Sequence, residues 1–268
     1  MLRGLQVGFG ALIGSDLLAS LRGLGVEMIR LGFPRPQTTA TEIRAMLTEV
    51  RDAGLTPLAI ITTEQALLLP SDWSLDVELY NEPDIGTPPT PRMTSAEYAQ
   101  RVQRAHAIVG ERHRLWAGSV SNLDEDSLDW LRHSIPYWPE SVGVSVHRYP
   151  CKGAPPTLPQ DGFASRQAEV DALKAIIGSR PWCVSEFGYH TAEWTTGWWF
   201  WRKRYRWTDE QVAAFVAWEW AFWERAGAVS ATLYQINDGA EDTALGRFGI
   251  RDIGGTWKPV AHTFAPAR

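Results

Sequence analysis

The sequence has only two cysteines, Cys151 and Cys183, among 268 residues. Two cysteines cannot form a four-cysteine metal site or a scaffold held by several disulfides. No stretch of the sequence approaches the roughly 18 apolar residues that a membrane-spanning helix requires. Charge of neither sign dominates, because 26 Lys and Arg stand against 31 Asp and Glu, a net charge of −5. We therefore expect no membrane partner and no general nucleic-acid binding.

Signatures of several enzyme classes are also missing. The six histidines show no H-E-x-x-H or comparable metal-ligand spacing. No G-x-G-x-x-G follows a predicted strand, and no serine or threonine has the context of a nucleophile elbow. We therefore expect no metal, no cofactor and no esterase. The glycine-interrupted start, MLRGLQVGFGALIG, predicts a first strand and turn rather than a secretory leader and leaves the cell compartment open.

Short apolar runs rich in β-branched residues alternate with amphipathic segments, a pattern typical of strand–helix units around a parallel sheet. A barrel of eight such units usually has about 250 residues. We predict an α/β fold, a single (β/α)8 TIM barrel formed by residues 1–268, with an open doubly wound sheet as the alternative. The predicted strands are Gln6–Gly10, Glu27–Gly32, Thr56–Thr62, Leu75–Tyr80, Leu115–Val120, Gly143–Tyr149, Trp182–Phe187 and Ser230–Ile236.

Helix starts are marked by capping boxes, in which two side chains satisfy backbone donors at the first turn. The boxes are Thr39–Glu42, Thr94–Glu97 and Thr208–Gln211. A further helix is predicted over Arg166–Ile177. The third unit is shortened, because only about a dozen residues separate its strand from the next, and a short closing helix is expected to open at Pro259.

Two glutamates follow strands that face each other across such a barrel. Glu82 lies in DVELYNEPD after the fourth strand, and Glu186 lies in WCVSEFGYH at the end of the seventh. Barrel chemistry occurs at the carboxyl ends of the strands, where the loops converge. Two opposed carboxyl groups fit glycoside cleavage, in which one protonates the leaving oxygen and the other meets the reacting carbon. A lone glutamate in a loop is more often simply solvated.

The sequence around these two glutamates resembles the paired motifs of the retaining glycoside hydrolases of clan A, and is most similar to families 5 and 39. The motifs are NEP at 81–83 and SEFG at 185–188. Arg30 at the end of the second strand, and His147 and Tyr149 at the end of the sixth, match further family positions in order. The resemblance covers the whole chain and implies a (β/α)8 barrel acting on a carbohydrate.

Carried over residue by residue, the resemblance implies that Glu82 is the general acid and base and Glu186 the nucleophile. Asn81 would hydrogen-bond the 2-hydroxyl of the sugar. Tyr149 would donate a hydrogen bond to Glu186, and Arg30 would lie close to it, both favouring the ionised carboxylate. Glu82 would need an environment that keeps its proton before attack. His147 lines the subsite or is a structural histidine at the barrel rim.

The sequence departs from family 5 at two strand ends. The tryptophan usual at the end of the eighth strand is missing from LYQINDG, so Tyr234 or Gln235 must form the floor under the sugar, or the floor differs. A histidine often found after the third strand is replaced by Thr62 and Thr63. These departures leave the family within the clan and the sugar specificity open.

Tryptophan is unusually common, with 14 residues, and residues 194–207 read WTTGWWFWRKRYRW. This long loop follows the seventh strand, so Trp194, Trp198 and Trp199 are candidates for stacking on sugar rings. The alternative is a self-packed loop or an interface with another chain. Its basic residues would attract an anionic polysaccharide or, as we favour, form a solvated face. Trp218, Trp220 and Trp223 fall at helical spacing and are expected to pack in the core.

The sequence thus predicts a retaining β-glycoside hydrolase that cleaves a β-linked polysaccharide or oligosaccharide by double displacement, and we expect it to cleave within the chain rather than at its end. That mechanism requires carboxyl groups roughly 5–5.5 Å apart. The alternatives are a non-catalytic carbohydrate-binding barrel and a transglycosylase that uses the same two glutamates. The oligomeric state stays open.

Overall fold

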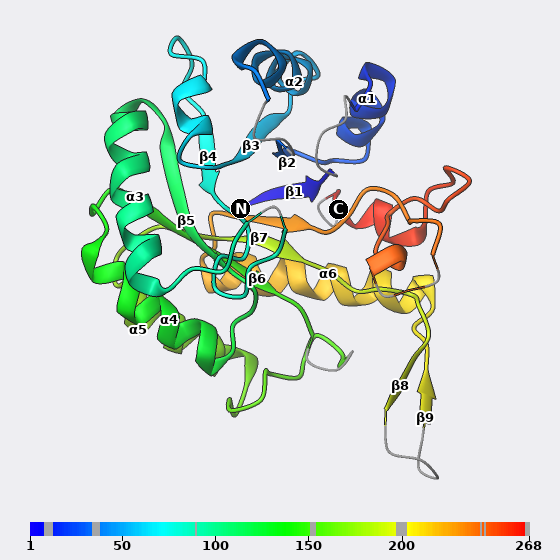
Figure 1. Ribbon diagram of the computed structural model, residues 1–268. Helices are drawn as coiled ribbons and strands as arrows, with labels where there is room; N and C mark the ends of the chain where they lie inside the picture. The colour runs from blue at the N-terminus through cyan, green and yellow to red at the C-terminus, as the bar shows by residue number, and fades with distance from the viewer. Residues whose placement is uncertain are drawn as a thin grey trace.

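Eight parallel strands close into a barrel in the order β1-β10-β7-β6-β5-β4-β3-β2. The computed structural model describes residues 1–7, 13–33, 38–88, 90–150, 154–196, 203–241, 243 and 245–265. The helices lie around the outside of the barrel (Figure 1). The predicted (β/α)8 fold is therefore confirmed, and the alternative of an open sheet is wrong.

Seven of the eight barrel strands lie close to their predicted positions. The strands are β1 (Leu2–Gln6), β2 (Met28–Gly32), β3 (Thr56–Ile61), β4 (Asp76–Leu79), β5 (Arg114–Val120), β6 (Gly143–Arg148), β7 (Trp182–Phe187) and β10 (Ser230–Leu233). The exception is β1, predicted at Gln6–Gly10, which begins four residues earlier. Its register places Gly4 against β10, where a Cβ atom would stand 2.8 Å from Thr232 Oγ1. The same register places Gln6 beside Arg30.

Three of the helices begin where the capping boxes predict. The helices of the described residues are α1 (Ser15–Gly23), α2 (Ala40–Asp52), α3 (Ser95–Val109), α4 (Glu125–Ser134), α5 (Arg166–Ile177) and α6 (Asp209–Ala226). All three capping boxes form, at the starts of α2, α3 and α6. The shortened third unit holds only the 3-10 turn Gln65–Leu68, and the chain closes with the 3-10 turn Pro259–Thr263. Among the described residues, no helix has the length and apolar character to cross a membrane.

The long loop after β7 contains a two-stranded hairpin that the sequence analysis did not predict. Strand β8 (Trp194–Thr196) pairs antiparallel with β9 (Lys203–Tyr205). The hairpin projects away from the barrel (Figure 1). The tip of this loop, residues 197–202, lies outside the described residues.

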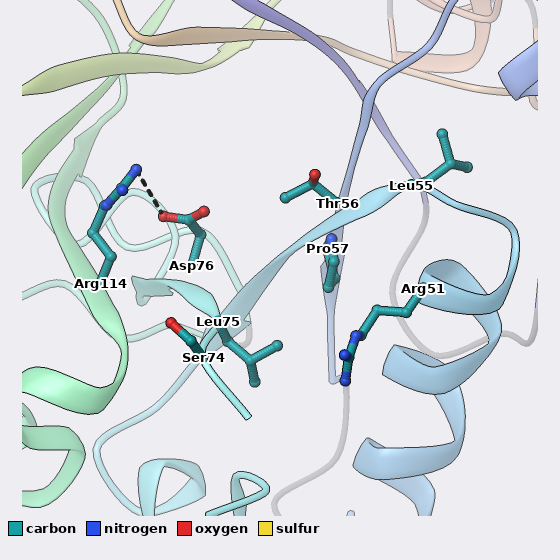
Figure 2. A pocket seen from close by; sticks show the side chains of 8 residues that line it. All are labelled: Arg51, Leu55, Thr56, Pro57, Ser74, Leu75, Asp76 and Arg114. Atoms are coloured by element: carbon teal, nitrogen blue, oxygen red, sulfur yellow. Dashed lines mark ion pairs between the residues drawn. The ribbon is translucent and has the colours of Figure 1, made fainter. Parts of the chain in front are cut away.

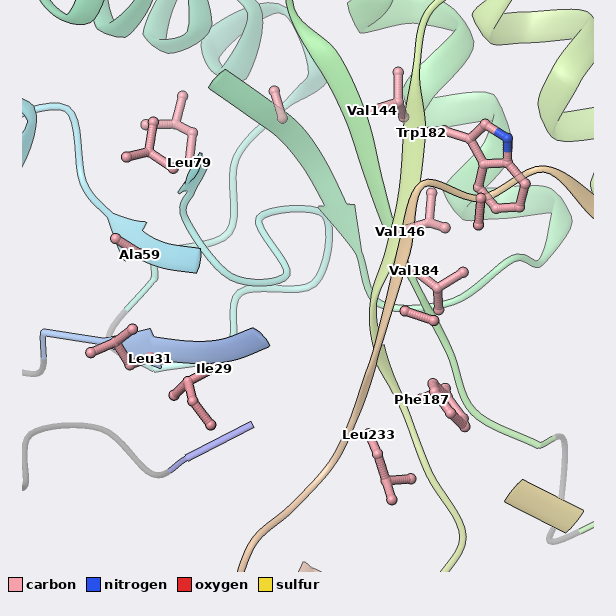
Figure 3. Packing of buried hydrophobic residues seen from close by; sticks show 14 of the residues in the cluster. Ile29, Leu31, Ala59, Leu79, Val144, Val146, Trp182, Val184, Phe187 and Leu233 are labelled. Atoms are coloured by element: carbon pink, nitrogen blue, oxygen red, sulfur yellow. The ribbon is translucent and has the colours of Figure 1, made fainter. Parts of the chain in front are cut away.

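Side chains alternate between two environments along each barrel strand. One set, including Ile29, Leu31 and Val184, packs with residues of the helices in a large buried cluster (Figure 3). A second and smaller cluster consists of Met28, Leu58, Trp116 and Cys183. Because Met28 and Arg30 are two residues apart on β2, they face the same way. The barrel interior is thus apolar near the start of the strands and becomes polar toward their carboxyl ends.

Candidate active site

Glu82 and Glu186 meet at the carboxyl end of the barrel. One carboxylate oxygen of each, together with a ring nitrogen of His147, lie within 4.8 Å of one another. Glu186 is the second-last residue of strand β7 and is buried, whereas Glu82 follows β4 and is partly exposed. The chain turns sharply after β4, since Tyr80 and Glu82 have positive φ angles of 63° and 49°. The backbone N–H of Glu82 is fixed by the carbonyl of Ser119 at 3.0 Å.

Arg30 connects most of the polar groups beneath this pair of carboxylates. Its side chain is fully buried. Its acceptors are Glu78 Oε2 (2.5 Å), Gln6 Oε1 (2.7 Å), Glu186 Oε1 (2.7 Å), Asn81 Oδ1 (2.8 Å) and His147 Nε2 (3.2 Å). A guanidinium has five N–H donors, so each one has an acceptor here. Burial lowers the pKa of Arg30, but the charges of Glu78 and Glu186 outweigh burial and raise it above its usual value.

Glu78 was missed in the sequence analysis. It lies on β4 with its side chain fully buried, and it accepts a hydrogen bond from the Ser119 hydroxyl as well as from Arg30. Burial raises the pKa of Glu78, but the charge and the hydrogen bond of Arg30 outweigh burial and lower it. One signal was present in the sequence, because Glu78 stands between Val77 and Leu79 in a strand and so faces opposite to them.

His147 lies between the two candidate catalytic carboxylates. Its Nδ1 atom is 3.1 Å from Glu82 Oε1 and 3.3 Å from Glu186 Oε2. Its Nε2 atom faces Arg30, which can only donate, so we assign the ring proton to Nδ1. Burial lowers the pKa of His147, but Glu186 and the hydrogen bond to Glu82 outweigh burial and raise it. His147 is therefore buried and in direct contact with both glutamates.

Glu82, His147 and Glu186 are close enough together to be considered as metal ligands. A metal would need the lone pair of Nδ1, and the ring proton would then have to move to Nε2. At Nε2 it would point at the N–H of Arg30, 3.2 Å away. Two donors cannot share a hydrogen bond, so this set of ligands does not fit a metal ion.

Tyr149 donates from its hydroxyl to Glu186 Oε2 at 2.9 Å, the contact that the family resemblance implies. Burial and the charge of Glu186 raise the pKa of Tyr149 well above its usual value, so the hydroxyl keeps its proton. The ring packs edge-on against Tyr234 and Phe248, with centroids 6.3 and 5.6 Å away. Burial, with the charge of Glu186, raises the pKa of Tyr234 to about 12. Tyr234 thus adjoins the candidate site, and Gln235 follows it at the end of β10.

The carboxylate of Glu82 accepts hydrogen bonds at both oxygens. His147 contacts Oε1, and the hydroxyl of Thr87, which the sequence analysis also missed, donates to Oε2. Burial raises the pKa of Glu82, but the hydrogen bonds from His147 and Thr87 outweigh burial and lower it. In the free protein both neighbours therefore stabilise the ionised form of Glu82, rather than the protonated form that the family resemblance would require before attack.

The aromatic loop contributes little that can be assigned to the site. Trp198 and Trp199 lie outside the described residues, and Trp194 is placed only as part of β8. Of the basic residues, Arg204 is exposed and pairs with Glu193 at 3.6 Å, and Arg206 donates to the carbonyl of Thr191 at 3.1 Å. The expectation for α6 is confirmed, since Trp220 and Trp223 are buried, and the partly buried Trp218 packs against the same core cluster with its ring stacked on Phe222.

A recessed cavity of about 290 Å³ lies at the opposite end of the barrel (Figure 2). It is lined by Thr56 and Pro57 at the start of β3 and by Asp76 at the start of β4. Arg114 closes one side and pairs with Asp76 at 3.6 Å. Active sites in barrels of this kind lie at the carboxyl ends of the strands, so this cavity is not the candidate active site.

No protein-family model and no curated protein matches this sequence. Solved structures match it along nearly its whole length. Cel5A of Thermotoga maritima, crystallised with cellobiose, is 14% identical with a TM-score of 0.62, over 99% of this chain and 96% of that one. A β-1,3-glucanosyltransferase of Rhizomucor miehei, crystallised as an active-site mutant with laminaritriose, is 9% identical with a TM-score of 0.64, over 97% and 96%.

The family 30 subfamily 8 xylanase Xyn30A of Clostridium acetobutylicum is 11% identical with a TM-score of 0.62, over 98% of this chain and 69% of that one. At identities this low, the structural similarity shows a common fold and nothing more specific. The chain therefore has the barrel fold of the clan A glycoside hydrolases, as its motifs indicated.

Proposed function

We propose that the protein is a retaining β-glycoside hydrolase, with Glu82 as general acid and base and Glu186 as nucleophile. The observation that carries the proposal is the separation of the two carboxylates, whose nearest oxygens lie within 4.8 Å. Retaining enzymes place these groups about 5–5.5 Å apart, whereas inverting enzymes need about 6.5–9.5 Å to admit a water molecule. The spacing supports retention. The barrel fold shared with glycoside hydrolases supports the reaction class.

In the first step, a carboxylate oxygen of Glu186 attacks the anomeric carbon while Glu82 gives its proton to the leaving oxygen. The glycosidic bond breaks and a glycosyl ester of Glu186 forms. Arg30 and Tyr149 hold Glu186 in position for this attack. In the second step, Glu82 takes a proton from water, the water oxygen attacks the same carbon, and the bond to Glu186 breaks. Asn81 is proposed to bind the sugar 2-hydroxyl, since its carbonyl oxygen is occupied by Arg30 and its amide group can donate.

The two roles of Glu82 make different demands on its surroundings. Thr87 and His147 favour the carboxylate, which suits the second step. The first step needs the protonated form, and the lowered pKa of Glu82 makes that form scarce at neutral pH. We therefore expect kcat/KM to be highest on the acidic side of neutrality.

We propose a β-linked polysaccharide or oligosaccharide as substrate and cleavage within the chain. The proteins with this fold include one crystallised with cellobiose, one with laminaritriose and one named a xylanase. A transglycosylase is the second candidate, because two of the similar structures are β-1,3-glucanosyltransferases. A barrel that only binds carbohydrate is less well supported, since binding alone does not need two opposed carboxylates, one of them held by a buried arginine.

The first test is the release of reducing ends from β-glucans, mannans, xylans, galactans and uronate-containing polymers. Glu82→Ala and Glu186→Ala are compared with the wild type after each is shown to be folded by circular dichroism. Glu64→Ala is the matched control, because Glu64 is an exposed glutamate in the loop after β3. Release that is lost in the two site variants and kept in the control supports the proposal. Equal release by all four proteins refutes the assignment.

The mechanism is tested by product stereochemistry. With an activated aryl β-glycoside, the wild type is expected to release the β-anomer first, as proton NMR would show. Adding azide to Glu186→Gly should give an α-glycosyl azide, because the anion enters the space left by the carboxylate. Adding azide to Glu82→Ala should give the β-azide. An α-anomer from the wild type would exclude retention, and elongated products with an added acceptor sugar would favour the transglycosylase.

A further inference from the structure

Tyr149, which donates a hydrogen bond to the proposed nucleophile Glu186, lies just beyond the end of its strand. Strand β6 ends at Arg148, so the backbone of Tyr149 lies past the last strand pair formed with β7. Its N–H and carbonyl instead contact two side chains. The N–H donates to Asn122 Oδ1 at 3.3 Å, and the carbonyl accepts from Gln160 Nε2 at 2.5 Å. The position of the Tyr149 hydroxyl therefore depends on groups outside the strand.

Gln160 and Asn122 also bind each other, which fixes the orientation of both amides. Gln160 Nε2 donates to Asn122 Oδ1 at 2.7 Å. The carbonyl of Tyr149 can only accept, so the glutamine must present its nitrogen. The oxygen of Asn122 accepts in addition from its neighbouring backbone N–H, that of Leu123, at 3.0 Å. The two amide hydrogens of Gln160 thus have two fixed acceptors.

Gln160 is itself held in place by buried charged groups. Its side chain is buried, and its backbone N–H donates to the carboxylate of Glu169 on α5. Arg148 donates to the carbonyl of Leu158 at 2.8 Å and lies 3.5 Å from Glu169. The segment around Gln160 is therefore tied both to α5 and to the end of β6.

We propose that Gln160 is a positioning residue, which holds the backbone of Tyr149 so that the Tyr149 hydroxyl stays on Glu186. The inference rests on the proposed function for its kinetic consequence, but the contact itself exists in the free protein. Gln160 does not touch either carboxylate, so its effect must pass through Tyr149. A purely structural glutamine would alter stability and would affect activity equally whether or not the Tyr149 hydroxyl is present.

The test is a double-mutant cycle between Gln160→Met and Tyr149→Phe. Methionine keeps the length of the side chain and removes both N–H donors. Gln160→Met is expected to lower kcat about tenfold with little change in KM, because small displacements of catalytic groups are costly. In the Tyr149→Phe background the same change should have almost no further effect. Gln167→Met is the matched control, since Gln167 is an exposed glutamine on α5 that bonds Asp171.

A second readout needs no turnover. The chain is labelled with ¹³C at the phenolic carbon of its seven tyrosines, and the Tyr149 resonance is identified by its loss in Tyr149→Phe. Gln160→Met should shift that resonance and Gln167→Met should not. A wild type that cleaves no glycoside would defeat the proposed function, and the NMR shift would still decide the inference. An unmoved resonance, unchanged kcat or a full kinetic loss in both backgrounds would overturn it.

Discussion

Replacing Thr87 by valine is expected to move the alkaline limb of the kcat/KM profile to higher pH. The Thr87 hydroxyl donates to Glu82 Oε2 and is one of the groups that lower the pKa of Glu82. Valine keeps the branched shape and removes the donor. A hydrogen bond to a charged group contributes about 1.5–3 kcal/mol, and one pKa unit corresponds to about 1.36 kcal/mol. Because Thr87 is only half-buried, we take the lower end, about one pH unit.

The sign follows from the role proposed for Glu82. A general acid must be protonated, so activity falls as pH rises through its pKa, and kcat/KM reports the pKa of the free enzyme. Losing a donor to the ionised form raises the pKa of Glu82, and the protonated form then persists to higher pH. At a pH above the wild-type limb the variant should therefore be the faster enzyme, even though a contact in the site has been removed.

The assay is the initial rate on an aryl β-glycoside at low substrate concentration over a range of pH. Thr90→Val is the matched control from the same loop, because the Thr90 hydroxyl accepts from the N–H of Asn81 at 3.1 Å instead of contacting Glu82. The control should keep the wild-type limb, whatever its effect on the rate. A limb that stays in place in Thr87→Val, or that moves to lower pH, would refute the reasoning.

Four other outcomes are expected. Tyr149→Phe should lower kcat/KM about tenfold to a hundredfold through loss of a hydrogen bond to a carboxylate, and a wild-type value would show that the bond is not used. Arg30→Met should lower the free energy of unfolding by about 3–5 kcal/mol in urea titrations, because it leaves Glu78 and Glu186 unpaired and buried; a loss under 1 kcal/mol would contradict this estimate. Because the pKa of Glu78 is lowered by folding, its contribution to stability is complete above the unfolded pKa near 4.5 and is lost as the pH falls through the folded pKa. The melting temperature of the wild type should therefore drop in acid. The melting temperature of Glu78→Gln should drop less. Thr208→Ala, which removes the cap of α6, should cost about 0.5–2 kcal/mol of stability and leave kcat/KM unchanged, whereas a kinetic effect would mean that α6 influences the site.

Local signals explain which parts of the fold could be predicted. A capping box involves residues three apart, and all three boxes predicted from the sequence form. The limits of α5 were predicted to the residue, because Ser165 caps it and Gly178 ends it. The start of β1 was predicted wrongly, because its register is decided by contacts with β2 and β10 rather than by its own residues. The hairpin of β8 and β9 was missed for the same reason, since nothing in either strand alone identifies its partner.

The same distinction between local signals and contacts with distant residues applies to the candidate site. The sequence was enough to predict that residues at the carboxyl ends of the strands lie close together, because a closed barrel brings all of these ends to one side. Glu78 and Thr87 were missed, since a contact such as Arg30 with Glu78 joins residues 48 apart in sequence. The surroundings of Glu82 could not be predicted either. Its pKa depends on which atoms of His147 and Thr87 point at it, and a sequence does not contain that orientation.

The buried pair of Arg30 and Glu78 resolves a conflict in the electrostatics of the site. An arginine 2.7 Å from Glu186 orients the proposed nucleophile, but its positive charge would oppose the positive charge that develops on the sugar ring. Glu78 pairs with Nε of the same guanidinium and offsets its charge, so the arginine does not have to cancel the negative charge of Glu186. A buried ion pair rarely repays its desolvation in stability alone. Its value here is that Glu186 is held by strong hydrogen bonds while its negative charge remains available to the transition state.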